Sequence, residues 1–529
     1  MRKFLLLLTF LPLMASAYDA EIDGVYYNLD KNTNQAEVTY PTSPSDRYKY
    51  SGDIIIAESF TYDGIHYKVT SIGKSTFDMC FGLTSVIIPN SIISIGMGAF
   101  YDCSSLSTVT IPNSVTYIGE AAFGSCSSLT SITLSENITK IESRTFSGCY
   151  SLDSIIIPKN VTSIGDYAFS SCYSMSTHTG LYSVTIPSSV TSIGKDAFSG
   201  SNSLSSVHIT DLEAWCNIDF ENRESNPLHN RRATIFLNGK EITDVVIPDS
   251  VTSIKDWTFY GFDMTSVTVP NSMTSIGQEA FGDCVCLDSV HIHDLEAWCK
   301  IKFSDMTSNP LYEASYLYLN GNEVTDLVIP DGITAIEDYA FCNCNRLTSL
   351  TIPNSVTTIG DWAFDGCSGL TSVTIPNSVT NIGDRAFGDC NELTSISIGE
   401  SVKTIGKSAF DGDIRRVKDV YCYADDIPTT GDDVFHEPYM KYATLHVPAT
   451  SVEAYKATAP WSGFGNIVAL KDFFRGDVNG DGEVNGTDIQ KIINIILTDK
   501  YDENADINED GAVNGTDIQK IINIILTTE

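Results

Sequence analysis

A self-similarity with a period of 23 residues fills the middle of this chain of 529 residues. The segment from Leu370 to Glu392, LTSVTIPNSVTNIGDRAFGDCNE, is typical. One segment of this length cannot enclose a hydrophobic core, whereas stacked segments can, so the period predicts a solenoid of coils. The residues that mark the start of successive segments are Leu83, Leu106, Leu129, Leu152, Leu181, Leu204, Met264, Leu287, Leu347, Leu370 and Leu393.

The pattern inside each segment predicts its local structure. With the recurring leucine as position 0, apolar residues fall at +3 and +5, so LTSVTI reads as a short strand with one buried face. Pro at +6 ends that strand, and a second alternating run, SVTNI, follows. Gly at +13 turns the chain, and we expect Asp-x-Ala-Phe to form a helical turn. The Asp at +14 is then placed to cap that turn, as Asp166, Asp361 and Asp384 are.

Nine of the fourteen cysteines occupy position +20. Cysteines in an exported protein normally suggest disulfides, but side chains in one column of a stack point in parallel, which does not suit disulfide geometry. A linear column also does not supply the tetrahedral ligands of zinc. We interpret the column as a ladder of buried free thiols that act as small apolar residues. Its members are Cys80, Cys103, Cys126, Cys149, Cys172, Cys284, Cys344, Cys367 and Cys390.

The recurring pattern LTSVTIPNSVTxIGxxAFxGC resembles the BspA-type leucine-rich repeat of bacterial surface proteins. The resemblance extends from about Phe60 to Phe410. It implies an exported, curved leucine-rich repeat scaffold of short β-strands and helical turns that serves adhesion or contact with host and matrix. It implies no catalytic residues.

Two longer repeats interrupt the regular series. His208–Leu228 and His291–Leu311 match each other 83 residues apart, and each is followed by Leu-Asn-Gly, so 204–286 and 287–369 form a larger duplicated unit. Two functional interpretations are open: a metal cluster in the second copy, or Trp215 and Trp298 as platforms for sugar or peptide. The residues of the metal cluster would be His291, His293, Asp294 and Glu296.

A structural interpretation of the longer repeats is favoured over both. Leu212, Trp215 and Cys216 have the i, i+3, i+4 spacing of one helical face, which places the tryptophan in the core. Thr210 stands in the first copy where His293 stands in the second, so the metal set is incomplete there.

Hydroxyl side chains recur on the outer face of the first strand, at +2 and often at +4, as Ser372 and Thr374 do. Such residues are good β-formers on a solvated face. The alternative is a flat, hydroxyl-lined surface that binds a polymer or a protein.

The N-terminus has the features of a secretory signal peptide. Arg2 and Lys3 precede an apolar run, Phe4–Met14, and Ala15-Ser16-Ala17 offers a cleavage site before Tyr18. The run is too short to span a membrane, since spanning takes about 20 residues, and we expect no later span. The net charge of −35 argues against a nucleic-acid partner. We therefore expect a secreted or surface-associated protein.

A second duplication ends the chain. NGTDIQKIINIILT occurs at 485–498 and again at 514–527, each time after an oxygen-rich loop. A twelve-residue calcium loop needs oxygen ligands at positions 1, 3, 5, 7, 9 and 12, with Gly at position 6. Both loops fit, with position 7 acting through its carbonyl, and predict two Ca²⁺ ions. The ligands are Asp477, Asn479, Asp481, Glu483, Asn485 and Asp488 in the first loop and Asp506, Asn508, Asp510, Ala512, Asn514 and Asp517 in the second.

One amphipathic helix should follow each loop. Its predicted apolar stripe in the first copy is Ile489, Ile492, Ile493, Ile496 and Leu497. Loop-then-helix twice, with no entering helix and Asp at position 12, resembles the type I dockerin, a small all-α calcium-binding domain. The resemblance implies a cohesin module as partner. It also assigns the choice of cohesin to loop positions 10 and 11, which are Gly486 and Thr487 in one copy and Gly515 and Thr516 in the other. Because the copies match, two docking orientations related by a half-turn are physically possible.

These features predict five regions: signal peptide 1–17, N-terminal cap 18–59, solenoid 60–410, atypical repeats and cap 411–471, and the dockerin-like module 472–529. The leading hypothesis is a non-catalytic binding protein whose solenoid presents a surface to an unknown protein or glycan. Its calcium-dependent dockerin would attach that surface to a cohesin-bearing surface or to a polysaccharide-degrading complex. The alternatives are a dockerin-borne glycoside hydrolase, which needs two carboxylates across a cleft, and an adhesin for host matrix.

Overall fold

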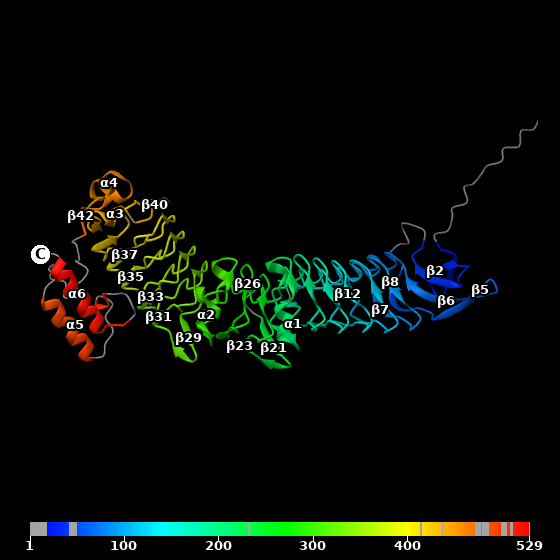
Figure 1. Ribbon diagram of the computed structural model, residues 1–529. Coiled ribbons are helices and arrows are strands. Elements are labelled where there is room, and N and C mark those ends of the chain that lie inside the picture. Colours follow the sequence, from blue (N-terminus) through cyan, green and yellow to red (C-terminus); the bar gives the residue numbers. More distant parts are fainter. Residues whose placement is uncertain are drawn as a thin grey trace, which may run out of the picture. The chain divides into compact units, whose positions relative to one another are not determined.

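A computed structural model describes residues 18–41, 50–176, 178–230, 233–412, 415–435, 437–470, 478, 486–498, 505–507 and 512–527. The chain divides into two compact units. Unit 1 comprises 1–325, 336–347 and 362–367, and unit 2 comprises 326–335, 348–361 and 368–529. Both contain stacked coils with two columns of short parallel strands (Figure 1). The predicted solenoid is therefore confirmed.

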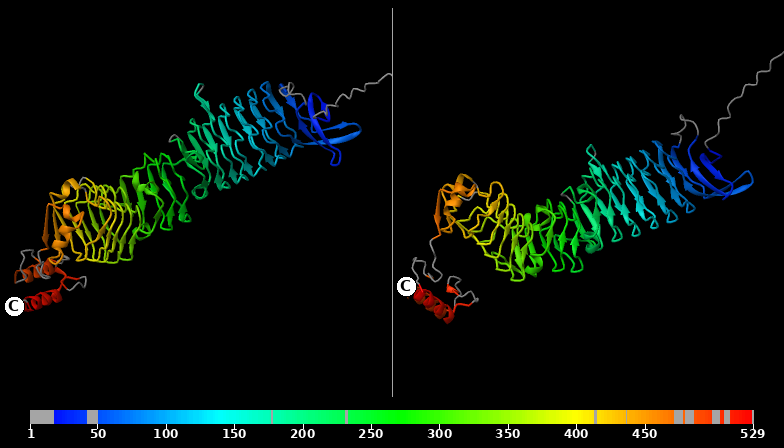
Figure 2. Two further views of the ribbon diagram at one scale, coloured as in Figure 1. Left: turned by 90° about the horizontal axis from the view of Figure 1, so that it is seen from above. Right: turned by 45° about the horizontal axis from the view of Figure 1, so that its top comes forward.

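Unit 1 begins with a mixed sheet in the order β1-β2-β3-β6-β8-β10. The antiparallel hairpin β5–β6 extends at its N-terminal end in Figures 1 and 2, and β6 also pairs in parallel with the strand of the first full coil. The strands are β1 (Ala20–Ile22), β2 (Val25–Asp30), β3 (Gln35–Thr39), β5 (Ser59–Tyr62), β6 (Ile65–Ile72), β8 (Ser94–Ile95) and β10 (Tyr117–Ile118).

The first strands of the coils in unit 1 stack in one column of three hydrogen-bonded sheets, which we call the first sheet, and two short antiparallel strands extend it. Its members are β4 (Gly52–Ile55), β7 (Leu83–Ile87), β9 (Thr108–Thr110), β11 (Ser131–Thr133), β13 (Ser154–Ile156), β17 (Ser183–Thr185), β19 (Ser206–Ile209), β21 (Thr234–Leu237), β22 (Lys240–Glu241), β23 (Asp244–Val246), β25 (Ser266–Thr268), β27 (Ser289–Ile292), β29 (Tyr316–Leu319) and β30 (Asn322–Glu323).

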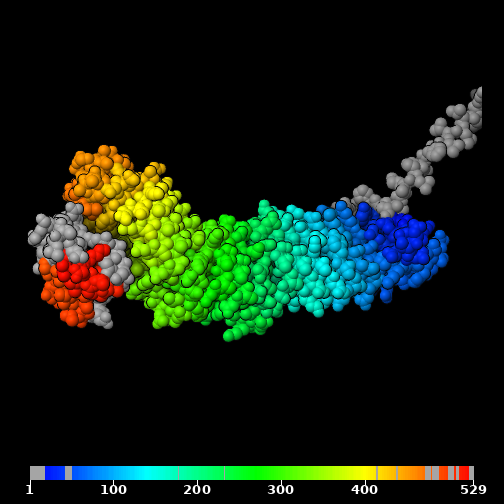
Figure 3. Space-filling view, in the orientation of Figure 1, coloured from blue at the N-terminus to red at the C-terminus, as the bar shows by residue number. Residues whose placement is uncertain are grey.

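The second strands of unit 1 form a column of two-residue strands. They are β8, β10, β12 (Lys140–Ile141), β14 (Ser163–Ile164), β18 (Ser192–Ile193), β20 (Asp219–Phe220), β24 (Ser253–Ile254), β26 (Ser275–Ile276) and β28 (Lys302–Phe303). A small hairpin, β15 (Tyr173–Ser174) and β16 (Thr179–Gly180), is inserted between two coils. Consecutive coils pack directly against each other, as the colour bands from blue to green show in Figure 3.

Unit 2 repeats the arrangement and ends in helices. Its first sheet contains β31 (Asp326–Val328), β33 (Ser349–Thr351), β35 (Ser372–Ile375), β37 (Ser395–Ile398), β39 (Asp419–Cys422), β41 (Thr444–Val447) and β42 (Asn466–Ala469). Its second column contains β34 (Thr358–Ile359), β36 (Asn381–Ile382), β38 (Thr404–Ile405) and β40 (Thr429–Thr430), and β32 (Ala335–Ile336) lies at the unit boundary. The helices are α3 (Glu437–Met440), α4 (Val452–Ala457), η4 (Trp461–Gly463), α5 (Gly486–Thr498) and α6 (Gly515–Thr527).

The core of the coils is a set of columns of identical residues. Phe100 and Phe123 are fully buried, and their rings stack at 5.1 Å with 5° between their planes. The same stacking runs through Phe77, Phe100, Phe123, Phe146, Phe169 and Phe198 of unit 1 and through Phe387, Phe410 and Phe435 of unit 2. Each coil therefore covers the apolar face that its neighbour cannot bury alone.

The cysteine column is a ladder of free thiols, as predicted. Eight of the nine side chains are buried, and Cys344 is half-buried. Burial raises the pKa of the Cys126 thiol to about 12. Its Sγ donates to the carbonyl oxygen of Phe100 in the preceding coil at 3.1 Å, and Cys149 repeats this contact with Phe123 at 3.2 Å. The column therefore also satisfies main-chain carbonyls that face the core.

The helical turn predicted for Asp-x-Ala-Phe is wrong. The residue after the Asp is left-handed, as at Tyr167 (φ 57°), which breaks an α-helix. The turn bonds across coils instead: the amides of Arg144, Phe146 and Gly148 donate to the carbonyls of Asp166, Ala168 and Ser170 at 2.8–2.9 Å. These segments thus form a third ladder between coils.

The capping role predicted for the Asp at +14 is also wrong. Asp166 Oδ1 accepts from the amide of Lys195 in the next coil at 3.1 Å. Asp361 and Asp384 do the same with the amides of Asp384 and Lys407, at 2.7 and 2.6 Å. These carboxylates join adjacent coils and do not cap a helix of their own coil.

The two long repeats place their tryptophans in the core, which confirms the structural interpretation. Trp215 lies on α1 (Leu212–Cys216) and Trp298 on α2 (Leu295–Trp298), and each is 1% exposed. Their Nε1 atoms donate to the carbonyls of Thr258 and Ala340 at 3.1 and 3.0 Å. The helices are followed by 3-10 turns η1 (Arg223–Ser225), η2 (Met306–Ser308) and η3 (Pro310–Tyr312).

Candidate calcium-binding and docking site

The duplicated C-terminal segment forms two helices of thirteen residues that share one small core. α5 and α6 contribute Ile492 and Ile521, both fully buried, and Val478 and its counterpart Ile507 belong to the same buried cluster. Each pair is separated by 29 residues, the spacing of the duplication. The two copies therefore fold as one module.

The predicted apolar stripe of α5 is correct at Ile492 and wrong at Leu497. Ile489, Ile493 and Ile496 are half-buried, whereas Leu497 is 77% exposed. Leu497 lies in the last turn of the helix, beyond the shared core, which is too small to cover it.

Each helix begins directly after its predicted calcium loop. Gly486 and Gly515 are the first helical residues, and Asp488 and Asp517 lie in the first turn with their side chains fully buried. Carboxylates at this end of a helix are stabilised by the helix dipole. This placement brings the ligand predicted at loop position 12 to the end of each loop.

The second loop is the better described of the two. The amide of Asn514 donates to Asp517 Oδ2 at 2.9 Å, and the Asn514 side-chain amide donates to the Ala512 carbonyl at 3.3 Å. Asn514 Oδ1 accepts from both the amide and the hydroxyl of Thr516, at 2.9 Å each. Three predicted ligands, Ala512, Asn514 and Asp517, are thus brought together, and Asp506 is 8% exposed.

The remaining predicted ligands lie outside the described residues. They are Asp477, Asn479, Asp481, Glu483 and Asn485 of the first loop and Asn508 and Asp510 of the second. Among the described residues, no group of three or more His, Cys, Asp and Glu side chains is arranged to hold a metal.

The described loop residues fit a calcium ion. Asp488 and Asp517 are 0% exposed and Asp506 is 8% exposed, and burying carboxylates is costly unless hydrogen bonds or a cation compensate them. Carboxylate, amide and carbonyl oxygens are the donors that Ca²⁺ takes. Bound there, the ion would supply the positive charge that such a set of oxygens requires.

Lys491 is a loop contact that sequence reasoning missed. From α5 its Nζ donates to the carbonyl oxygen of Val478, at loop position 2, at 2.7 Å. Lys520 occupies the equivalent position of α6. The sequence shows the lysine in both fourteen-residue copies, which marks it as a repeated feature. It does not show that the partner is a carbonyl oxygen of the loop.

The predicted cohesin-contacting residues lie at the start of the helices. Gly486, Gly515 and Thr516 are exposed, and the side chain of Thr487 is outside the described set. A Cβ added at Gly486 or Gly515 would meet no atom within 4 Å. Gly486 and Gly515 therefore have open space beside them among the described residues.

The metal cluster considered for the second long repeat is not formed. His291 stacks on Tyr318 with ring centroids 4.9 Å apart, and His293 Nδ1 lies 3.4 Å from Asn320 Oδ1. Asp294 instead caps α2 by accepting from the amides of Glu296 and Ala297.

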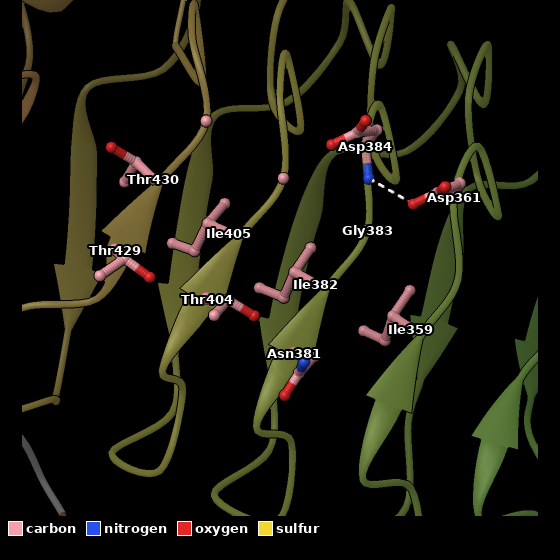
Figure 4. Close-up of a pocket in the computed structure, with 12 residues that line it drawn as sticks. Ile359, Asp361, Asn381, Ile382, Gly383, Asp384, Thr404, Ile405, Thr429 and Thr430 are labelled. Carbon is pink, nitrogen blue, oxygen red and sulfur yellow. Dashed lines mark hydrogen bonds between the residues drawn. The ribbon is translucent and has the colours of Figure 1, made fainter.

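Shallow grooves follow the second strands in each unit. The one in unit 2 has a volume of about 610 Å³ and lies over Gly383 and Gly406, with Asp361 and Asp384 among its lining residues. Figure 4 shows these residues and the bond from the Asp384 amide to Asp361. The groove of unit 1, of about 400 Å³, has the same Ile, Gly and Asp lining.

No helix in the described parts of the chain is both long and apolar enough to cross a membrane. No curated protein matches the chain.

Solved structures with leucine-rich repeats are similar to this chain. A leucine-rich repeat protein from Bacteroides ovatus ATCC 8483 is 23% identical, with a TM-score of 0.47, and the match covers 86% of this chain and 100% of that one. A leucine rich cell surface protein from Faecalibacterium prausnitzii A2-165 is 24% identical, with a TM-score of 0.26 and coverages of 86% and 94%. A leucine-rich repeat protein from Eubacterium ventriosum ATCC 27560 is 19% identical, with a TM-score of 0.33 and coverages of 70% and 94%.

Family models match both parts of the chain. The model for the BspA type leucine rich repeat region, which spans six copies, matches residues 57–176, 175–222, 230–309 and 314–439. The model for the dockerin type I domain matches residues 475–526. Since the repeat matches cover more than half of the chain, it belongs to the BspA-type leucine-rich repeat family and carries a C-terminal type I dockerin domain.

Proposed function

We propose that this is a secreted, non-catalytic binding protein whose dockerin anchors the repeat solenoid to a cohesin-bearing surface or complex. Dockerin type I domains generally bind calcium and attach to cohesins, and proteins with these two kinds of domain are typically extracellular or surface-associated. The signal peptide expected at 1–17 lies outside the described residues and would direct export.

The observation that carries the proposal is the matched start of α5 and α6. In both copies a buried Asp, 488 or 517, follows an exposed Gly by two residues. A buried carboxylate next to an open surface suits a calcium loop that shapes a docking face. Two such faces support two ions and two docking orientations, with Gly486, Thr487, Gly515 and Thr516 as partner contacts.

The solenoid supports a binding role because repeats fill most of the chain and the first sheet offers an open outer face. The coils continue beyond 410, where β39, β41 and β42 extend the first sheet of unit 2 and Trp461 and Tyr455 are fully buried. This arrangement supports 411–471 as closing repeats and cap, with the docking module at 472–529. The ligand of the sheet is a protein or a glycan.

A capture experiment tests the docking half. A panel of type I cohesins is immobilised, and the full chain is applied with calcium present. Because the copies match, Thr487→Arg and Thr516→Arg should each leave capture by the other copy intact, while the double variant should lose it. Capture of the double variant at wild-type level, or no capture of the wild type by any cohesin, would refute the docking proposal.

A further inference from the structure

Two similar rows, each of five side chains, lie across the outer face of the first sheet of unit 1. Residues within each row are register partners on adjacent strands, so their side chains share one face. Row A lies on β13, β17, β19, β21 and β22, and row B on β23, β25, β27, β29 and β30. Row A is Ile156, Thr185, His208, Phe236 and Glu241, and row B is Val246, Thr268, His291, Tyr318 and Glu323.

The rows combine exposed apolar groups with stacked rings. Ile156 is 71% exposed and Val246 is 63% exposed. His208 stacks on Phe236 with centroids 4.8 Å apart, and His291 stacks on Tyr318 at 4.9 Å. The four rings are half-buried, and within each pair the two rings lie at about the spacing of the strands. Figure 1 shows β21 and β29 extending toward the same edge of unit 1.

The rows match each other where they cross the duplicated unit. Other exposed positions of the unit have diverged in some places, as Asn217 and Lys300 or Asp219 and Lys302 have, and are unchanged in others, as Glu213 and Glu296 are. Within the two copies His208 corresponds to His291, Glu241 to Glu323 and Phe236 to Tyr318. Ile156 and Thr185 lie before the duplicated unit, and Thr at this position is usual in regular coils.

The rows are narrow. Most of the neighbouring outward residues on the same strands are small and hydroxylic, as Ser183, Ser206, Ser266 and Ser289 are, but Asp244 and Tyr316 also belong to this line. The apolar surface is thus one side chain wide except at β29, where it is two wide, whereas a stable protein interface buries about 800 Å² on each partner around an apolar centre. A single extended polymer fits this width better than a folded protein does.

The charge of the surface selects among polymers. Each row ends at a carboxylate, Glu241 or Glu323, and the chain as a whole carries −35. Polyanions such as uronate or sulfated chains are repelled, while carboxylates accept hydrogen bonds from hydroxyl groups. Glu323 forms an ion pair with Arg346, whose Nε donates to it at 3.1 Å. This pair holds the carboxylate in place and offsets its charge, so the repulsion rests on Glu241 and on the net charge of the chain.

We propose that rows A and B together bind a neutral polysaccharide chain. The ring stacks and the exposed aliphatic side chain contact the apolar faces of the sugars, and the Thr, His and Glu groups pair with their hydroxyls. Two equivalent rows in one unit suit a ligand that itself repeats. This inference rests on the proposed function, since it names the ligand of the binding surface.

The test is affinity electrophoresis of the full chain in gels containing barley mixed-linkage β-glucan, xyloglucan or galactomannan, with polygalacturonate as the anionic comparison. We expect retardation by at least one neutral polymer and none by polygalacturonate. The row variants are His208→Thr with Phe236→Thr, and His291→Thr with Tyr318→Thr, because Thr occupies this position in regular coils such as those of Thr110 and Thr374. Each pair should weaken binding about fivefold to tenfold, the loss of one or two ring contacts.

The combined variant of both rows should weaken binding by more than either pair, because two rows on one chain act together. Asp219→Lys is the matched control, since the second copy already has Lys302 there, and it should bind like the wild type. Three results would overturn the proposal. They are retardation of the wild type by polygalacturonate alone, retardation by none of the polymers, and equal retardation of the wild type and the combined variant. Cohesin capture by the same variants is independent of these outcomes, so failure of this inference and failure of docking are distinguishable.

Discussion

The thiol of Cys126 donates a hydrogen bond of 3.1 Å to the carbonyl oxygen of Phe100, three positions and one coil away. Cys103, Cys149, Cys172, Cys284 and Cys367 make the same contact with the Phe of the preceding coil. In the coil that has Ser201 at this position, its hydroxyl donates to Phe169 at 2.6 Å. The column therefore requires a small side chain with a donor, and not sulfur as such.

Replacing Cys126 by Ala should destabilise the solenoid, because the Phe100 carbonyl loses its partner and a small cavity remains. The expected loss is about 1–3 kcal/mol in the free energy of unfolding. Cys126→Ser should retain most of the stability, as Ser201 does in its own coil. Denaturant unfolding followed by circular dichroism measures both, and Cys286→Ala, at an exposed thiol, is the control. Equal stability of the Ala and Ser variants would contradict the role of the bond.

Thiol titration should distinguish one cysteine from the rest. Burial raises the pKa of Cys126, Cys172 and Cys216 to about 12, so almost no thiolate forms at these sites near neutral pH. Only Cys286 is exposed among the fourteen, and desolvation with nearby Asp263 raises its pKa as well. We expect one thiol to react with a disulfide reagent in the native protein, faster as pH rises, and fourteen after unfolding. Rapid reaction of several thiols in the native state would contradict the buried ladder.

The glycine at +13 and the aspartate at +14 depend on each other. A Cβ at Gly406 would lie 2.4 Å from the amide nitrogen and 2.5 Å from Oδ1 of Asp384 in the preceding coil. Gly406→Ala should therefore cost about 1–3 kcal/mol, as overpacking does. Lys407→Ala keeps the amide that Asp384 binds and should be nearly neutral. Thermal unfolding measures the stability of both variants. Wild-type stability of Gly406→Ala would contradict the close approach of the two coils, because it would show that they can move apart to make room for the methyl group.

The direction in which replacing Lys491 changes calcium affinity distinguishes two roles for this residue. If its ammonium only adds positive charge near the first loop, removing it should tighten calcium binding. If it positions the loop through the Val478 carbonyl, as the 2.7 Å contact indicates, Lys491→Met should weaken calcium binding. We expect the second result, by about tenfold, the effect of losing a charged hydrogen bond. Calorimetric titration of calcium into the full chain measures it, and tighter binding would contradict the positioning role.

The sequence predicts those features that the period determines. The coils, their strands and the thiol ladder repeat every 23 residues, so burial follows from position alone. The role of Asp384 does not follow, because its partner is the amide of Lys407 one coil away and a local helix signal fits the same letters. Leu497 fails for a related reason: the helix period continues after the shared core of two short helices has ended. Rows A and B could not be predicted from the sequence, because each of their residues reads as an ordinary solvated strand position. Only the strand register shows that they are neighbours.

The central claim is calcium-dependent docking, and capture of the full chain on an immobilised cohesin at controlled free calcium tests it most directly. We predict capture that rises with calcium occupancy of two sites, disappears in chelator and returns when calcium is restored. Asp477→Ala with Asp506→Ala should abolish capture while the circular dichroism of the solenoid strands stays unchanged. Capture that is unaffected by chelator, or by this double variant, would contradict the account.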